Sequence, residues 1–188
     1  MDEKTKKKAV WAWTMYDWGN SAFATTIMAA VLPVYYSSVA ASTLPPNIAT
    51  ARWGFTTSFA ALLVAIIGPI LGAVADFKGN KKRFLSIFMG IGVTATALLY
   101  FVKTGDWLLA SILYIFGSIG FSGSLVFYDA LLPHVASPEE IDQVSSRGFA
   151  MGYIGGGVLL AINVLMITFG DTLFPNIDPT LMSRLSFV

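Results

Sequence analysis

Long runs of apolar residues alternate with short polar segments along this chain of 188 residues. The hydrocarbon core of a bilayer is about 30 Å thick, and roughly 20 consecutive apolar residues cross it in helical form. Several runs reach this length with almost no ionisable side chain, which the core of a soluble helical bundle does not require. We therefore predict five complete transmembrane helices. Their approximate bounds are 18–38, 53–75, 84–102, 107–132 and 149–169.

A polar segment follows the fifth predicted helix. Residues 170–183 contain two aspartates and two prolines, and residues 185–188 have the character of the first turn of another helix. The loops between the apolar runs are too short to form a separate soluble domain. We predict one all-α integral membrane unit over residues 1–188, with five complete transmembrane helices and the start of a sixth at 185–188.

Basic side chains are unequally distributed between the two ends of the predicted helices. Nine of them precede the first, third or fifth helix, and three fall at the opposite ends. Because cytoplasmic loops of membrane proteins are enriched in Lys and Arg, the N-terminus is predicted to be cytoplasmic. A signal peptide is the alternative for the basic N-terminal segment, but the apolar run after it is too long. The nine are Lys4, Lys6, Lys7, Lys8, Lys78, Lys81, Lys82, Arg83 and Arg147, and the three are Arg52, Lys103 and Arg184.

The composition agrees with a membrane protein, since 55% of the residues are hydrophobic and 12% are charged. The net charge of +1 carries no information about a nucleic-acid or acidic partner, and we expect no nucleic acid among the partners. The chain has no cysteine, which excludes disulfides and thiolate metal sites, and its single histidine, His134, has no second histidine nearby. No nucleophile, base and orienting partner occur at a recognisable spacing. We therefore expect neither a cofactor nor a metal, and no enzymatic activity.

Polar side chains inside the apolar runs are the first candidates for functional residues. A carboxylate in the middle of a membrane costs on the order of 3 kcal/mol, so such groups face protein or water. On the first run, Asp17, Asn20 and Ser21 form one polar stripe that Thr25 extends. Asn163 lies deep in the fifth run, where it is either an interhelical hydrogen-bonding group or a substrate contact. We predict that these five residues are candidates for a substrate cavity.

Charged residues also gather near the predicted cytoplasmic ends of several helices. Asp17, Asp76 and Asp129 lie at such ends, and Arg147 lies at the start of the fifth helix. Brought together, they would form a charge cluster at the inner mouth of a pore. For Asp17 and Asp129, the alternatives are interfacial residues hydrated by headgroup water, or gate partners and proton carriers.

Glycines at helical spacing predict close contacts between helices, because small residues let two backbones approach in lipid. Gly68 and Gly72 form one such pair on the second helix. Gly148, Gly152 and Gly156 form a longer ladder on the fifth. We expect both faces to contact other helices.

The segment from Gly72 to Arg83, GAVADFKGNKKR, resembles the loop signature of the major facilitator superfamily and falls between the second and third helices, as in that superfamily. Phe77 and Asn80 depart from the signature, which usually has basic residues there. Three further stretches resemble the branch related to the fungal autophagy-linked vacuolar amino-acid effluxer. These stretches are YDWGNSAFAT at 16–25, FYDALLP at 127–133 and VSSRGFAMGY at 144–153.

This resemblance implies a protein of twelve helices in two halves, with a substrate cavity at the midplane between them. The chain would supply most of the N-terminal half, and the C-terminal half of the same polypeptide would be its partner. The resemblance also implies an inner gate in the loop and a possible second gate at the ends of the fourth and fifth helices. The inner-gate residues are Gly72, Asp76, Gly79, Lys81, Lys82 and Arg83, and the second-gate residues are Tyr128, Asp129 and Arg147.

The leading hypothesis is a secondary active transporter that exports a small solute by alternating access, with amino acids as one candidate substrate. Its partners would be the solute and the lipid bilayer of a prokaryotic plasma membrane. The coupling ion stays open, with the proton as one candidate. The alternative is a membrane scaffold that binds other helices through its glycine faces and transports nothing.

Overall fold

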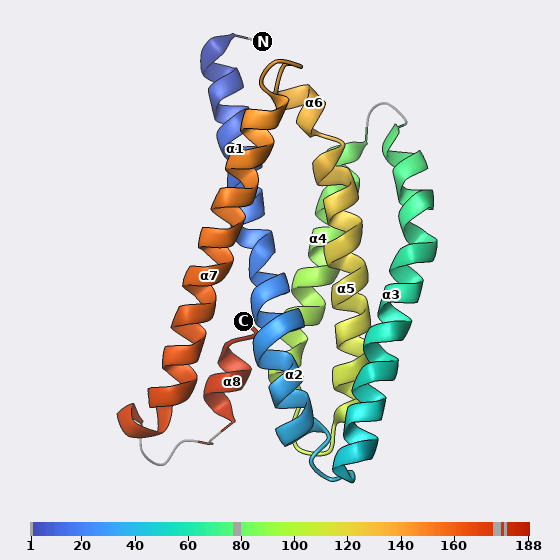
Figure 1. The fold of residues 1–188 in the computed structure, drawn as a ribbon, viewed down its shortest axis with the longest axis vertical. Coiled ribbons are helices and arrows are strands. Elements are labelled where there is room, and N and C mark those ends of the chain that lie inside the picture. Colours follow the sequence, from blue (N-terminus) through green and yellow to red (C-terminus); the bar gives the residue numbers. More distant parts are fainter. Residues whose placement is uncertain (1, 77–79, 175–177, 179) are drawn as a thin grey trace.

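The computed structural model describes residues 2–76, 80–174, 178 and 180–188, and no β-strand occurs among them (Figure 1). Five helices are long and apolar enough to cross a membrane, in agreement with the all-α membrane fold predicted from the sequence. The described helices are α1 (Glu3–Ala22), the π-helical η1 (Phe23–Ala30), α2 (Val31–Tyr35), the π-helical η2 (Tyr36–Ala40), α3 (Pro46–Asp76), α4 (Lys81–Leu98), the 3-10 turn η3 (Leu99–Phe101), α5 (Trp107–Asp129), α6 (Leu132–Val135), α7 (Ile141–Leu173) and α8 (Leu181–Leu185).

The first helix starts well before its apolar run. Asp2 caps α1 by accepting a hydrogen bond from the backbone N–H of Thr5, and Lys7 pairs with Glu3 one turn earlier. These local interactions favour helix without any apolar partner. The polar N-terminal residues therefore extend the helix beyond the segment that the hydropathy pattern marks.

The middle of the first span is π-helical rather than α-helical. Pro33 lies in α2 just after η1, and it has no backbone N–H to donate to the carbonyl one turn earlier. The backbone N–H of Val31 instead bonds to the carbonyl of Thr26, five residues back. This wider turn changes which side chains of the span face each neighbouring helix.

Three helix pairs carry most of the packing: α4 with α5, α1 with α7, and α3 with α5. Figure 1 shows α1 and α7 side by side on one flank, α4 and α5 in the middle and α3 on the other flank. The N-terminus and α6 lie at one end of the bundle, and the loop after η3 lies at the other. The large apolar side chains of α3, such as Phe55, Phe59 and Ile66, are mostly exposed, as expected for a surface that faces lipid or another membrane segment.

Glycines set the closest helix contacts. A Cβ on Gly120 of α5 would collide with the backbone N and Cα of Gly92 on α4. On α7, a Cβ on Gly152 would lie 2.6 Å from the Ser21 hydroxyl oxygen of α1. The predicted contact face of the glycine ladder on α7 is thus observed. Gly68 and Gly72 differ, because a Cβ on either residue would meet nothing within 4 Å among the described residues. Gly68 borders a small gap of about 40 Å³ between α3 and α5, so these two helices do not approach there as closely as we expected.

Two clusters of buried side chains lie at opposite ends of the bundle. The larger one contains Leu32, Tyr36 and Val102, and it also takes up Phe187 from the segment after α8. The smaller one contains Trp13, from α1, and lies at the end that bears the N-terminus. The short helix α8 occupies Leu181–Leu185, and residues 186–188 follow it without helical structure. That a sixth span begins there stays a prediction.

Candidate functional site

Three of the predicted cavity residues lie in the contact between the first span and α7. Asp17 is only 9% exposed, and it accepts a long hydrogen bond of 3.5 Å from the Ser21 hydroxyl. A Cβ on Gly152 would lie 2.9 Å from Asp17 Oδ2, so the carboxyl group packs directly against the α7 backbone. One turn further on, the Thr25 hydroxyl donates to the carbonyl of Gly156 at 3.2 Å. The glycine ladder thus makes room for a buried polar face.

Asn20 points away from this contact. It lines a cavity of about 490 Å³ between the first span, α4 and α5, which Phe187 and Val188 border at one end. The Asn20 amide nitrogen is buried and has no hydrogen-bond partner among the described residues. The cavity lining contains no Asp, Glu, His, Lys or Arg side chain. Its polar members are Tyr16, Asn20, Thr26, Thr96, Ser124 and Ser186.

Asn163 of α7 makes an interhelical contact. The residue is buried, and its side-chain amide donates to the Thr26 hydroxyl of η1 at 3.2 Å. Of the two roles left open by the sequence, the structure shows the hydrogen bond between helices. The five cavity candidates are therefore divided between two surfaces, with Asn20 on one and the other four at the contact with α7.

An aromatic cluster covers the buried polar face on the side of the N-terminus. The ring of Tyr128 stacks on Trp13 at 4.2 Å between centroids and on Tyr16 at 4.9 Å. The Trp13 indole N–H donates to the carbonyl of Tyr128 at 3.1 Å. The hydroxyl groups of Tyr16 and Tyr128 are buried without a hydrogen-bond partner among the described residues. We call these three side chains the aromatic cap.

The inner-gate residues do not form one cluster. Asp76 is the last residue of α3 and is exposed, and no ion pair to it occurs among the described residues. The C-terminal end of its own helix carries partial negative charge, so a stabilising helix N-terminus has to come from another element. A Cβ on Gly72 would meet open space, and Gly79 lies outside the described residues.

Lys81 is engaged in a different way. Its Nζ donates to the carbonyl of Ala130, at the C-terminal end of α5, at 3.1 Å and lies 3.2 Å from His134 Nε2. A cation at a helix C-terminus is favoured because it satisfies free carbonyl groups and complements the helix dipole. Lys82 and Arg83 are exposed. The basic turn thus connects α4 to the end of α5.

The charged residues of the predicted second gate are not paired with each other either. Asp129 and Arg147 are both exposed, and no ion pair joins them in the described part of the chain. The ion pair found at this end connects Lys6 of α1 to Glu140, just before α7. Together with hydrogen bonds from Ser137, Lys6 lowers the pKa of Glu140 to about 2. Sequence reasoning did not find this pair, because nothing local relates residues so far apart.

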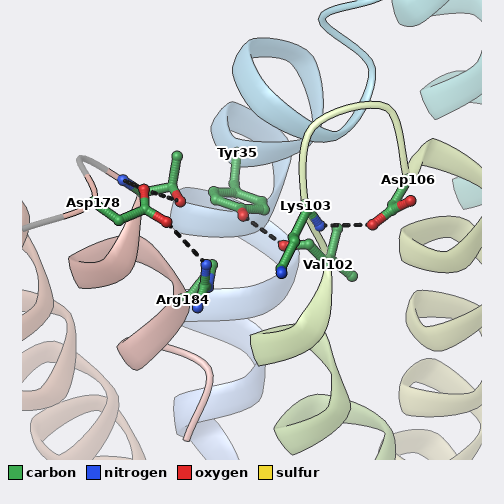
Figure 2. A network of polar contacts seen from close by, with 7 residues as sticks. Tyr35, Val102, Lys103, Asp106, Asp178 and Arg184 are labelled. Carbon is green, nitrogen blue, oxygen red and sulfur yellow. Dashed lines mark hydrogen bonds and ion pairs between the residues drawn. The ribbon is translucent and has the colours of Figure 1, made fainter.

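A polar network closes the opposite end of the bundle (Figure 2). The Tyr35 hydroxyl donates to the carbonyl of Val102 at 2.8 Å, and Arg184 donates to Asp178 at 3.1 Å. The Arg184 guanidinium also lies over the ring of Tyr100, 4.8 Å from its centroid. The contact of Arg184 with Tyr100 holds the segment around α8 against η3, and the ring of Phe187 packs edge-on against Tyr35 of the first span, 5.4 Å between centroids. Hydrogen bonds from Thr180 and the nearby Arg184 charge lower the pKa of Asp178.

Several residues that shape the site were not singled out in the sequence. Gly117, Gly120 and Gly123 on α5 pack against Phe23, Gly92 and Phe88, respectively. Their spacing of three residues on one helix was the available signal for a close contact. No group of three His, Asp or Glu side chains able to hold a metal occurs in the part of the chain that the structure describes.

Five apolar helices of spanning length, with polar side chains buried at helix contacts, define a multi-pass membrane protein. Comparison with known families is more specific. The model of the family described as "Vacuole effluxer Atg22 like" matches residues 47–177, and the chain belongs to this family.

Two similar proteins show the breadth of the relationship. The chain is 39% identical over 177 residues to the uncharacterized MFS-type transporter YxiO of Bacillus subtilis, a match that covers 94% of this chain and 41% of that protein. It is 29% identical over 106 residues to autophagy-related protein 22-2 of Aspergillus fumigatus, covering 50% of this chain and 17% of that protein. No solved structure matches the chain. The resemblance to the major facilitator superfamily and its Atg22 branch is thereby confirmed.

Proposed function

We propose that this chain is part of a secondary transporter that exports a small solute by alternating access, with amino acids as the first candidates. One observation carries the proposal: 94% of the chain aligns with a protein named as an MFS-type transporter at 39% identity. The structure adds a buried carboxyl group, that of Asp17, at the contact of α1 with α7, and an acidic group inside a membrane domain is expected to have a functional role. The prokaryotic plasma membrane, with the N-terminus in the cytoplasm, is the proposed location.

The arrangement of helix contacts supports a further transmembrane helix after residue 188. In an inverted repeat, α1 and α3 correspond to α5 and α7, so the α3–α5 contact corresponds to the α7–α1 contact, and both are present. In the same scheme, the contact of α4 with α5 requires a later helix against α1. The cavity beside Asn20 lies along α1, and Val188 borders it. We propose that the polypeptide after residue 188 packs there and provides an acceptor for the Asn20 amide.

The gates would work through bonds that form in only one conformation, because such a bond stabilises that conformation alone. Asp76 is the candidate for the inner gate, and its exposure in this conformation leaves it available to a basic group or a helix N-terminus of the second half. Asp129 and Arg147 are the corresponding candidates for a second gate. In this view, the Lys6–Glu140 pair remains a contact within this half.

Counterflow of labelled amino acids into liposomes that contain the full-length protein tests the proposal. The Asp76→Asn variant should lose most of the exchange, because the gate loses its charge. Asp142, an exposed acid in the first turn of α7 at the same end of the bundle, supplies the matched control Asp142→Asn, which should exchange like the wild type. Equal exchange by the two variants would remove Asp76 from the mechanism.

One observation favours the alternative of a membrane scaffold: a Cβ on Gly72 of α3 would meet nothing within 4 Å among the described residues, which leaves this glycine available to another helix. The two functions differ in their response to solutes. A transporter gains thermal stability when its substrate binds, by mass action, whereas a scaffold does not. A thermal-shift screen of the purified full-length protein against amino acids, peptides and sugars separates them.

A further inference from the structure

The carboxyl group of Asp17 is buried in the membrane-spanning part of the bundle without a basic partner. It is 9% exposed, and among the described residues its side chain makes only the long hydrogen bond with Ser21. The α7 surface against it is the backbone at Gly152, which brings no charge. An ionised carboxylate in such surroundings costs several kcal/mol when neither a cation nor a set of hydrogen bonds compensates it.

The titratable groups on the elements packed around Asp17 do not supply this compensation. On α1 the neighbour is Tyr16, and on α5 the neighbours are Tyr128 and Asp129. On α7 the nearest charged side chain at this end is Arg147, which is exposed and forms no ion pair with Asp17. A negative charge on Asp17 therefore has no basic side chain within ion-pair distance in the described part of the chain.

The aromatic cap lies directly over this site. Trp13 is one helical turn before Asp17 on α1, and its ring stacks on Tyr128 from α5. The same ring packs against α7, since a Cβ on Gly148 would lie 2.6 Å from Trp13 Cζ3. Three elements thus close the site on the side of the N-terminus, where water would otherwise reach the carboxyl group.

We propose that Asp17 is an occluded proton-binding site, which holds a proton while α1 and α7 are packed through Gly152 beneath the aromatic cap. The proton leaves as Asp17 becomes hydrated when the cap opens. This inference deepens the proposed transport function and rests on it for its biological role. A site that binds a proton in one conformation and releases it in another links the conformational equilibrium to the proton gradient.

Infrared spectroscopy of the purified full-length protein in detergent tests the proton directly, because the C=O stretch of a protonated carboxyl group is distinct from the carboxylate bands. At pH 7, the difference between wild type and Asp17→Asn should contain such a band. Asp142→Asn, which removes an exposed acid at the same end of the bundle, should leave it in place. If Asp17→Asn does not fold, Asp17→Glu keeps the acid at a displaced position and should shift the band.

Two further measurements complete the test. Trp13→Ala should reduce the band at pH 7 several-fold, because water then reaches the site, whereas Tyr128→Phe keeps the stacked ring and should retain it. Absence of the band in the wild type, or its loss on addition of sodium but not of potassium chloride, would overturn the proposal. The infrared result does not depend on transport, so a band without solute exchange refutes only the transport function, and exchange without the band refutes only the proton site.

Discussion

The close approach of α4 and α5 gives a sharp stability prediction at Gly120. Alanine at this position places a methyl group against the backbone N and Cα of Gly92 and near the carbonyl oxygen of Phe88. Backbone atoms cannot rotate away as the end of a side chain can, so the two helices have to separate. Overpacking of this kind costs about 1–3 kcal/mol, and rigid neighbours favour the upper end. Alanine regains about 1 kcal/mol of helix propensity over glycine.

The net expected loss for Gly120→Ala is therefore about 2 kcal/mol. For a chain of this size, each kcal/mol lowers the melting temperature by about 2–4 °C, which gives a decrease of about 4–8 °C. Thermal unfolding in detergent, followed by circular dichroism, measures it. The matched control is Gly90→Ala on α4, where a Cβ would meet nothing within 4 Å, and this variant should be as stable as wild type or more so. A melting temperature of Gly120→Ala equal to that of Gly90→Ala would refute the reasoning.

Three other predictions follow from the same structure. On α7, Gly152→Ala should lower the melting temperature because its methyl group meets Ser21, whereas Gly157→Ala, with open space around it, should not. The pKa of Glu140 is lowered from 4.5 to about 2, so its ion pair adds stability above the unfolded-state pKa that is lost as the pH falls toward 2. Accordingly, Glu140→Gln should reduce the melting temperature slightly at pH 7 and not at about pH 2. Arg184→Ala should free the α8 segment from Asp178 and speed its hydrogen exchange, and unchanged exchange would show that the ion pair does not hold the segment.

The sequence predicted the helical membrane class because the length of an apolar run is a local property that needs no tertiary partner. Each of the five predicted runs corresponds to a helix of spanning length. Family resemblance also followed from local motifs, such as the loop that begins at Gly72. The ends of the helices were less predictable, since Asp2, Glu3 and Lys7 extend α1 by capping and pairing rather than by hydrophobicity.

Only the tertiary structure decided which side of each helix meets which neighbour. Asp17 and Asn20 belong to one polar stripe in the sequence, yet the first packs against α7 and the second lines the cavity beside α4. Gly68 and Gly152 both belong to pairs spaced four residues apart, but among the described residues a Cβ would collide with another helix at Gly152 and not at Gly68. Spacing fixes which residues share a helix face, but the partner of that face depends on how distant helices pack together, which no local pattern contains.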